Sequence, residues 1–259
     1  REGANLYKPW SDQPSEFELI ATYFKDLTGQ RGVALGIGDD GALINPSADT
    51  QLVMASDTLV ESVHFPADAS GEQVASRALC VNLSDMAAMG ATPKWFTLAL
   101  TMPKHLANNQ WLKSFSAGLA DVAKEFDIAL VGGDTTLGPL AVSITMLGEV
   151  PVGQALQRNG ALVGDAIYVT GTLADGAAAL NMLKANANKV TEDSERLLAR
   201  FYRPQPQIEA GIALRNIASA CIDISDGLVA DLGHICLASG VKANLVAQWL
   251  PIHRQLREM

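Results

Sequence analysis

The stretch LGIGDDGALI, residues 35–44, decides between two fold classes. Its three glycines fit the G-x-G-x-x-G spacing of loops that bind the pyrophosphate of a dinucleotide. Such loops hold phosphate through backbone N–H groups and the positive end of a following helix. Aspartates occupy both positions before the third glycine, Asp39 and Asp40, and two carboxylates there would repel an anion.

The segments around these glycines argue against a dinucleotide-binding fold. The preceding RGVALGIG, residues 31–38, is typical of a strand. The following residues 42–60 contain a proline and a turn-like NPSADT, and then an apolar run typical of a second strand. The dinucleotide motif needs a helix at that point. A glycine turn that carries solvated aspartates remains the simpler alternative.

The composition limits the fold and the partners. The chain has 259 residues, of which 48% are hydrophobic and 18% charged, so it can form one large domain or two of ordinary size, and we expect two. The net charge of −9 argues against nucleic acid or an anionic membrane as partner, because such partners require a basic surface. An acidic protein can still bind phosphates when metal ions accompany them.

The cysteines and the apolar segments limit the compartment. Cys80, Cys221 and Cys236 include no C-x-x-C pair, which predicts neither a disulfide framework nor a zinc site. No segment approaches the ~18 uninterrupted apolar residues of a membrane span, and residues 1–20 lack the apolar core of a signal peptide. We therefore expect a cytoplasmic protein. The chain begins without Met and ends in a helix-like HRQLREM, so we expect it to continue at both ends.

The hydrophobic patterning of the first half predicts an α+β domain with hairpins. Helices are expected over residues 15–27, with Ser15 available as the cap, over residues 71–90, and over an amphipathic stretch at 111–126. Strands are expected on both sides of the Asp-Asp turn and then over residues 94–103, 128–136 and 140–150.

The second half alternates more regularly and predicts an α/β domain. Strands are expected over residues 165–171, 220–224 and 241–247. Helices are expected over residues 173–183 and 228–239 and on both sides of YRPQPQ, residues 202–207. We place the domain boundary near residue 152, which gives an N-terminal domain of residues 1–152 and a C-terminal domain of residues 153–259.

Acidic residues recur at the ends of the predicted elements. Most of them follow an apolar strand directly or lie beside Gly, Ser or Thr, where open sheets place ligand-binding groups. The series comprises Asp39, Asp40, Asp57, Asp85, Asp134, Asp223 and Asp226. Several converging carboxylates with few Lys or Arg nearby would repel one another unless cations joined them.

Magnesium ions would resolve this repulsion. Mg²⁺ takes oxygen ligands and is typically shared between one or two carboxylates and substrate phosphates. The lack of a Cys/His cluster argues against zinc and copper. The positive charge that binds phosphate would then come from metal, and not from a helix terminus or a lysine.

Asp85 differs from the other aspartates because it is predicted to lie within a helix. Its neighbours are small or apolar, and Asn82 lies three residues earlier on the same helix face. A carboxylate in such surroundings costs free energy unless it is paired with a cation or hydrogen-bonded. The alternative is that Asp85 forms the polar edge of an otherwise buried helix.

Three further residues are weaker candidates. His64 could contact an anionic or hydroxylic group, although a histidine is more often structural. Arg158 could reach a phosphate, although a surface arginine is the commoner case. Ser225 could cap the helix that opens at Gly227 and still line a site.

Six motifs, taken together and in order, resemble the bacterial thiamine-monophosphate kinase family. They are GIGDDGALI (36–44), SDTLVESVHF (56–65), NLSDMAAMGATP (82–93), GGDTT (132–136), RNGALVGD with IYVTG (158–171), and IDISDGLVADLGHI (222–235). The resemblance spans nearly all of residues 15–250. That family belongs to a superfamily with aminoimidazole ribonucleotide synthetase, selenophosphate synthetase and a hydrogenase-maturation protein, which share ATP use and an aspartate-rich cleft filled with Mg²⁺.

The resemblance implies both an architecture and a reaction. It implies a homodimer in which mixed sheets of two N-terminal domains pair into a barrel, with a C-terminal α/β domain packed alongside. It also implies phosphorylation of thiamine monophosphate by ATP to give thiamine diphosphate and ADP, through direct in-line transfer of the γ-phosphoryl group.

Matched motif by motif, the resemblance implies several Mg²⁺ ions and roles for individual residues. The implied metal ligands are Asp40, Ser56, Asp57, Asp85, Asp134, Asp223 and Asp226. The implied ATP contacts are Gly133, Asp134, Arg158 and Ser225. His64 matches a contact to thiamine monophosphate, and Ala55 stands where the family often has a hydroxyl residue. We assign no general base, because the second pKa of a phosphate monoester is about 6 and the acceptor is already largely ionised. No role follows for Asp39.

Two other hypotheses stay open. The first is a sibling enzyme that activates a carbonyl or selenide with ATP, although such enzymes generally use N-terminal Cys, Lys or Gly-rich segments that this sequence does not show. The second is a non-catalytic module that binds Mg²⁺ or a nucleotide.

Overall fold

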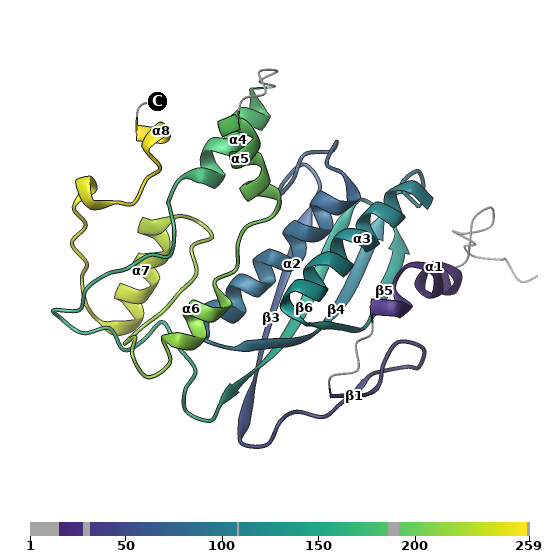
Figure 1. The fold of residues 1–259 in the computed structure, drawn as a ribbon, viewed down its shortest axis with the longest axis horizontal. Coiled ribbons are helices and arrows are strands. Elements are labelled where there is room, and N and C mark those ends of the chain that lie inside the picture. Colours follow the sequence, from purple (N-terminus) through teal and green to yellow (C-terminus); the bar gives the residue numbers. More distant parts are fainter. Residues whose placement is uncertain (1–15, 28–31, 108, 186–191, 258–259) are drawn as a thin grey trace, which may run out of the picture. The chain divides into compact units, whose positions relative to one another are not determined.

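The computed structural model describes residues 16–27, 32–107, 109–185 and 192–257 (Figure 1). The chain forms two compact units, neither of them continuous in sequence. The first unit comprises residues 1–45, 56–78 and 94–145, and the second comprises residues 46–55, 79–93 and 146–259. The boundary that we place near residue 152 stays a prediction. Ser15, the expected helix cap, lies outside the described residues.

A mixed four-stranded sheet has the strand order β3-β6-β4-β5 (Figure 1). Its strands are β3 (Thr50–Val60), β4 (Thr92–Met102), β5 (Ala129–Leu137) and β6 (Ala141–Pro151). β4 and β5 are parallel, and helix α3 (Asn109–Phe126) supplies the crossover that parallel neighbours require. β3 and β6 are antiparallel, since Ser56 pairs with Thr145 and Thr58 with Ser143. The expected mixed sheet is confirmed.

The apolar stripe in the sequence of helix α3 forms the buried face of this helix. Leu112, Phe115, Leu119 and Val122 follow helical spacing and are completely buried. Helix α2 (Gly71–Ala88) lies beside α3, and glycines allow the close approach of their backbones (Figure 1). A Cβ atom at Gly118 would lie 2.8 Å from the backbone of Glu72, so any larger residue there would force the helices apart.

The segment around the Asp-Asp turn is a hairpin. β1 (Val33–Leu35) pairs with β2 (Leu43–Ile44) in antiparallel orientation, and they follow α1 (Glu16–Tyr23) and the 3-10 helix η1 (Lys25–Leu27). The glycine loop is thus followed by a strand and not by a helix. The structure confirms that this is not a dinucleotide-binding loop.

The C-terminal part of the second unit is helical. Its elements are α4 (Asp175–Lys184), α5 (Glu192–Tyr202), α6 (Ile208–Ala213), α7 (Leu228–Ser239), η2 (Ala247–Trp249) and α8 (Arg254–Arg257). A buried carboxylate joins α4 to α5, because Asp175 forms ion pairs with Arg196 at 3.3 Å and with Arg200 at 2.7 Å. Each of the helices expected in this half is present.

The prediction of three strands in the second half is wrong. Residues 165–171, 220–224 and 241–247 form no strand in the structure, and the nearest pairing is an isolated bridge between Leu173 and Ile252. A period-two pattern marks a segment that can pair, but a strand exists only where a neighbour supplies the ladder of hydrogen bonds. Tyr168, in the first of these segments, is 88% exposed.

Two further expectations concern cysteines and membranes. All three cysteines are free thiols, which agrees with the prediction that the chain has no disulfide framework. Among the described helices, none is long and apolar enough to cross a membrane.

Candidate functional site

The loop between β1 and β2 presents Asp39 and Asp40 to solvent. Gly38 precedes them with a φ of 128°, a backbone conformation that favours glycine. The Oδ1 atom of Asp39 accepts the N–H of Asp40 at 2.8 Å, so Asp39 braces the turn. The carboxylate of Asp40 remains exposed, as an approaching cation would require.

Strand β3 carries Ser56 and Asp57 on opposite faces of the sheet, because successive side chains alternate along a strand. The hydroxyl of Ser56 donates to the carbonyl of Ile144 at 3.2 Å and lies 3.0 Å from the Thr145 hydroxyl. Ser56 is exposed and Asp57 is half-buried. Of the two, Asp57 offers the charged oxygen that binds a hard cation strongly.

His64 lies in the turn that follows β3 and is exposed. Its ring atom Nδ1 accepts the backbone N–H of Val60 at 3.0 Å, and the backbone N–H of His64 donates to the Val60 carbonyl at 2.9 Å. Because Nδ1 is an acceptor in this hydrogen-bond network, the neutral ring carries its proton on Nε2. His64 can therefore offer one N–H donor to a ligand.

Strand β5 carries Gly133 and Asp134, both exposed. A β-bulge precedes them: Phe96 on β4 faces Leu130, but Thr97 faces Gly132, which leaves one extra residue in β5. A Cβ atom at Gly133 would overlap the carbonyl group of Leu98. The bulge and the glycine together let the chain approach β4 closely before it presents Asp134.

The sheet separates two of the predicted metal ligands. β3 and β5 are its outer strands in the order given above, and β6 and β4 lie between them. Neighbouring strands are ~4.8 Å apart, so Asp57 and Asp134 are separated by roughly 14 Å across the sheet. Within the described residues of one chain, these two carboxylates do not meet at one ion.

Helix α2 brings a second pair of predicted ligands together in the second unit. The Ser84 hydroxyl donates to Oδ2 of Asp223 at 3.2 Å, which places Asp223 next to the helix turn that carries Asp85. Both aspartates are half-buried, and Asn82 on the same helix is fully buried. Burial raises the pKa of the nearby Cys221 thiol.

The loop between Asp223 and α7 is organised by Asp231, which is not among the predicted site residues. Gly227 is the N-cap of α7, so the expectation that Ser225 caps this helix is wrong. Instead, Oδ2 of Asp231 accepts the N–H groups of Ser225, Asp226 and Gly227 at 3.0, 3.1 and 3.0 Å. Ser225 and Asp226 themselves are exposed. An acidic residue in the first turn of a helix that begins with glycine could have indicated this contact.

Arg158 lies in a loop that is hydrogen-bonded to Ser239, the last residue of α7. The Ser239 hydroxyl donates to the Arg158 carbonyl at 3.2 Å and accepts the N–H groups of Gly160 and Ala161, both at 3.1 Å. The Arg158 side chain is exposed. Its backbone is thus fixed while its guanidinium group can turn toward an anion.

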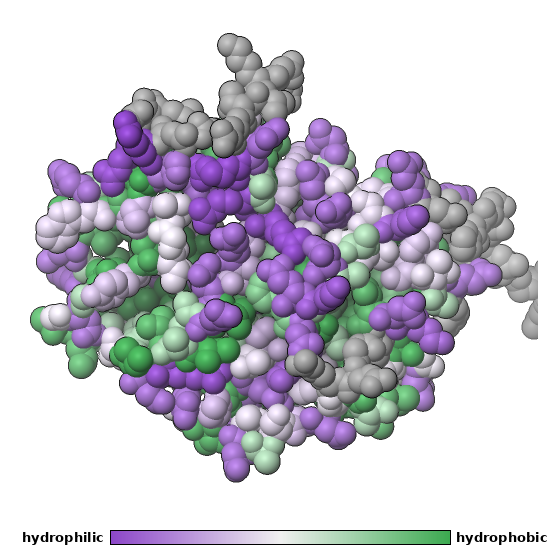
Figure 2. Space-filling view, viewed as in Figure 1, coloured by the Kyte–Doolittle hydropathy of each residue, from purple (hydrophilic) through white to green (hydrophobic). Residues whose placement is uncertain are grey.

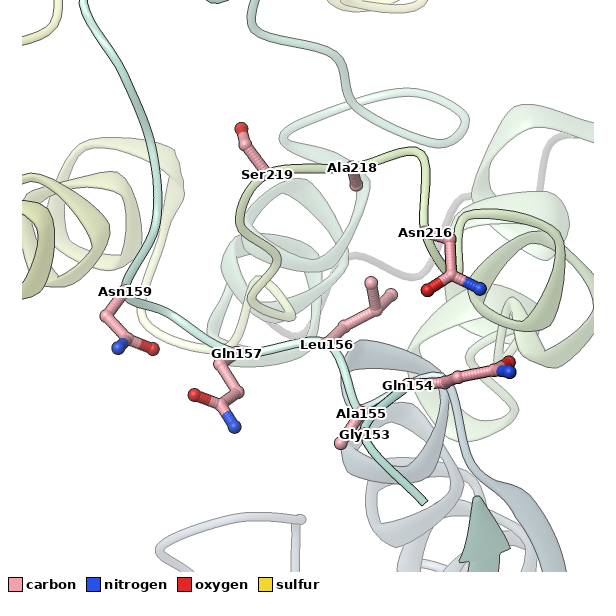
Figure 3. A pocket seen from close by; sticks show the side chains of 9 residues that line it. All are labelled: Gly153, Gln154, Ala155, Leu156, Gln157, Asn159, Asn216, Ala218 and Ser219. Atoms are coloured by element: carbon pink, nitrogen blue, oxygen red, sulfur yellow. The ribbon is translucent and has the colours of Figure 1, made fainter. Parts of the chain in front are cut away.

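A pocket of about 300 Å³ lies between residues 153–159 and residues 216–219 (Figure 3). Leu156 points from the first segment toward the second, and the pocket is otherwise lined by two alanine side chains, carboxamides, a hydroxyl and a glycine. Ser219, on its rim, donates to Oδ2 of Asp165 at 2.5 Å. This hydroxyl and the N–H of Leu162 hold the pKa of Asp165 below its ordinary value. The pocket lining carries no charged side chain, so it suits a neutral polar group better than a phosphate.

Helix α7 also carries exposed hydrophobic side chains. Val229 and Leu237, both on α7, are 76% and 83% exposed, and hydrophobic residues reach the surface in the space-filling view (Figure 2). The apolar surface of α7 therefore lies on the same helix as the two polar side chains, Asp231 and Ser239, that hold the loops.

The exposed site residues fit Mg²⁺ by their chemistry. Asp40, Asp134 and Asp226 offer hard carboxylate oxygens to solvent, and Mg²⁺ keeps several waters when it binds to one or two carboxylates. Among the residues with described positions, no three His, Cys, Asp or Glu side chains gather as a ligand set. The metal-ligand roles stay predictions.

Two family models match the chain. The model for the N-terminal domain of AIR synthase related proteins matches residues 38–150. The model for the C-terminal domain of the same proteins matches residues 163–259. Together the two matches cover well over half of the chain.

Individual relatives match over most of the chain. The thiamine-monophosphate kinase of Salmonella typhimurium is 49% identical over 239 residues, which cover 91% of this chain and 73% of that protein. The crystal structure of thiamine-monophosphate kinase from Stenotrophomonas maltophilia K279a matches with a TM-score of 0.83 and 47% identity, over 89% of this chain and 74% of that one. AaThiL complexed with AMPPCP and TMP matches with a TM-score of 0.78 and 32% identity, over 94% of this chain and 76% of that one.

Proposed function

Because this chain belongs to the thiamine-monophosphate kinase family, we propose that its aspartate motifs bind ATP, Mg²⁺ and thiamine monophosphate. The chain is an ATP-dependent kinase that phosphorylates thiamine monophosphate to thiamine diphosphate. The observation that carries the proposal is the ordered series of aspartate motifs in a chain 49% identical to a kinase of this family. The ligands of the AaThiL complex, AMPPCP and TMP, agree with the two proposed substrates.

The charge of the reactants sets the main physical problem. The reaction forms a bond between the γ-phosphorus of ATP and an oxygen of the acceptor phosphate, and breaks the bond to the bridging oxygen of ADP. Two anions must therefore approach each other, and phosphoryl transfer depends more on positioning and charge neutralisation than on covalent chemistry. Bound Mg²⁺ would supply that neutralisation and polarise the γ-phosphoryl group.

The carboxylates of both units are the proposed Mg²⁺ ligands. In the first unit these are Asp40, Asp57 and Asp134, with the hydroxyl of Ser56. In the second unit they are Asp85, Asp223 and Asp226. Their oxygen atoms suit Mg²⁺, and the chain's net charge of −9 makes a metal the natural source of positive charge for phosphate binding.

The remaining site residues would orient the two substrates. We assign ATP contacts to Gly133, Asp134, Arg158 and Ser225; Arg158 has an exposed guanidinium group on a fixed loop. His64 would donate its Nε2–H to the phosphate of thiamine monophosphate. No general base is needed, because the acceptor phosphate is largely ionised near neutral pH. Transfer is direct from ATP to the acceptor phosphate.

We also propose that the protein is a cytoplasmic homodimer whose N-terminal sheets pair into a barrel. The support is β3, an outer strand of eleven residues whose exposed side chains include Leu52 and Met54, at 47% and 71%. A long apolar edge of this kind is a surface on which another strand pairs.

The activity is tested by incubating the chain with ATP, Mg²⁺ and thiamine monophosphate and separating the thiamine esters by chromatography. We expect thiamine diphosphate to form in step with ADP. Asp85→Asn should abolish turnover, because it removes a charged oxygen that the proposal gives to the metal. Ser116→Ala, on the exposed part of α3, should leave the activity unchanged.

The reaction products distinguish this function from the two alternative functions. ADP without thiamine diphosphate would favour a sibling enzyme of the superfamily. Binding of ATP without any ADP would favour a non-catalytic nucleotide-binding module. Full activity of Asp85→Asn would contradict the metal-ligand role of Asp85 while leaving the kinase in place.

A further inference from the structure

One carboxylate oxygen holds the loop that carries Ser225 and Asp226. Oδ2 of Asp231 accepts three successive backbone N–H groups, from Ser225, Asp226 and Gly227, at 3.0, 3.1 and 3.0 Å. The residue is only 3% exposed. Hydrogen bonds to an ionised acceptor are roughly twice as strong as neutral ones, so this contact is a strong local constraint.

The sequence of the loop explains why Asp231 is needed. The N-cap of α7 is Gly227, which has no side chain to accept the free N–H groups at the start of a helix. Asp231, in the first turn of α7, reaches back to them, and its own N–H donates to the Gly227 carbonyl at 3.0 Å. The φ of 117° at Gly227 turns the chain so that the three N–H groups converge.

This arrangement has a consequence for phosphate binding. Converging N–H groups normally form a concave site for an external anion. Here an internal carboxylate already occupies that site, so the loop would meet a phosphate through the side chains of Ser225 and Asp226 and not through its N–H groups. The side chains of Ser225 and Asp226 are exposed, while Asp231, which holds their backbone, is buried.

We propose that Asp231 is a positioning residue for the kinase reaction, which fixes the Ser225–Asp226 loop so that it can bind Mg²⁺ and ATP. The inference rests on the proposed function, which makes Ser225 a nucleotide contact and Asp226 a metal ligand. Asp231 itself touches neither ligand. Its removal would leave the loop residues present but no longer held in place.

The kinetic test compares Asp231→Ala and Asp231→Asn with the wild-type chain. Alanine removes the acceptor, whereas asparagine keeps one oxygen and loses the charge. We expect Asp231→Ala to raise the KM for ATP and the half-saturating Mg²⁺ concentration by about 10- to 100-fold, the loss expected for hydrogen bonds to a charged group. The KM for thiamine monophosphate should change less than about twofold, because none of its proposed contacts lies on this loop. Asp231→Asn should recover part of the loss.

Asp175→Asn is the matched control. Asp175 is also a buried aspartate in the first turn of a helix of the second unit, but its partners are Arg196 and Arg200 on α5. It should lower the melting temperature while leaving the KM for ATP and the Mg²⁺ requirement unchanged. If Asp175→Asn shifted these quantities as much as Asp231→Ala, a general loss of stability would explain the effect and the proposal would be wrong.

A second measurement needs no ligand and no activity. Hydrogen exchange of the amides of residues 225–227 reports directly on the three bonds. We expect exchange about 10- to 100-fold faster in Asp231→Ala, with a smaller increase in Asp231→Asn. If Asp231→Ala does not fold, the Asp231→Asn variant provides both the exchange rates and the kinetic constants.

The two measurements separate the inference from the proposed function. Unchanged exchange at residues 225–227 overturns the role of Asp231 whatever the chain catalyses. Faster exchange with an unchanged KM for ATP would show that Asp231 holds the loop but that the loop does not contribute to ATP binding. This result would also overturn the positioning role of Asp231. A wild-type chain that forms no thiamine diphosphate refutes the kinase activity, and with it the catalytic part of this inference, even if exchange confirms the three hydrogen bonds.

Discussion

At the residue scale, His64 shows how an internal hydrogen bond limits what a side chain can offer to a ligand. Nδ1 is used inside the turn, where it accepts the Val60 N–H, and only Nε2 remains. The sequence alone suggested that His64 could contact an anion, because histidine is a versatile donor. It could not show which nitrogen was available, since this depends on a backbone turn that brings residues 60 and 64 together.

The two ring nitrogens of His64 can be tested separately. Asparagine at this position places an acceptor near Nδ1, and glutamine places an amide near Nε2. We expect His64→Asn to raise the KM for thiamine monophosphate by about tenfold, as for one lost hydrogen bond to a charged group, with the KM for ATP unchanged. His64→Gln should retain more of the affinity. Equal KM values for thiamine monophosphate in wild type and His64→Asn would contradict the substrate contact.

Asp165 gives a prediction about pH. Its pKa is lowered in the folded chain by the Ser219 hydroxyl and then by the Leu162 N–H. A lowered folded pKa means that the stabilisation is fully present above the unfolded value of about 4, and is lost as the pH falls through the folded pKa. We therefore expect the difference in melting temperature between wild type and Asp165→Asn to be largest near neutral pH and to shrink below about pH 4.

The partner residue provides the control for Asp165. In a Ser219→Ala background the main cause of the lowered pKa is removed, so Asp165→Asn should have a smaller effect at neutral pH. A difference in melting temperature that stays constant from neutral pH to pH 3 would show that the ionised form of Asp165 does not stabilise the fold.

At the element scale, the helices and the long strands of the first half were predictable, and the three strands expected in the second half were not. The stripe of Leu112, Phe115, Leu119 and Val122 specifies α3 by itself, because a helix satisfies its own backbone hydrogen bonds. Residues 165–171 have an equally apolar pattern but form no strand, because a strand depends on a partner that the local sequence does not contain. The contact between Ser84 and Asp223 could not be predicted either, because the two residues are 139 positions apart and the local sequence of one does not indicate the other.

The bulged strand β5 contains a matched pair of glycines. A Cβ atom at Gly133 would overlap the Leu98 carbonyl, whereas nothing lies within 4 Å of one at Gly132. We expect Gly133→Ala to destabilise the chain by about 1–3 kcal/mol, the typical cost of overpacking, and to raise the KM for ATP. Gly132→Ala should leave both quantities nearly unchanged. Thermal unfolding and ATP kinetics measure the two effects, and equal behaviour of the variants would contradict the role of close packing at Gly133.

At the scale of the whole molecule, the candidate site residues are distributed over both units and over very distant parts of the sequence. The first unit contributes Asp40, Asp57 and Asp134, and the second contributes Asp85 and Asp223. Motif order and residue type made these residues recognisable without any structure, because oxygen-rich groups beside glycine turns match the needs of Mg²⁺ and phosphate. Asp231 could be indicated only by an acidic residue in the first turn of a helix that begins with glycine. Ser239 was not recognisable, because its partners are backbone groups that carry no sequence signature.

The proposed dimer can be tested at the β3 edge. Met54 is 71% exposed on this outer strand, and a charged side chain on an edge strand opposes pairing with another strand. We expect the wild-type chain to have twice the monomer mass in light scattering, and Met54→Lys to weaken dimerisation by at least about tenfold, since burying an unpaired charge costs more than 1.4 kcal/mol. Ala117→Lys, at an exposed position on α3, is the control and should remain dimeric. If Met54→Lys stays folded by circular dichroism and keeps the dimer mass at micromolar concentration, β3 is not the dimer interface, and the barrel proposed for this family member would have to be abandoned.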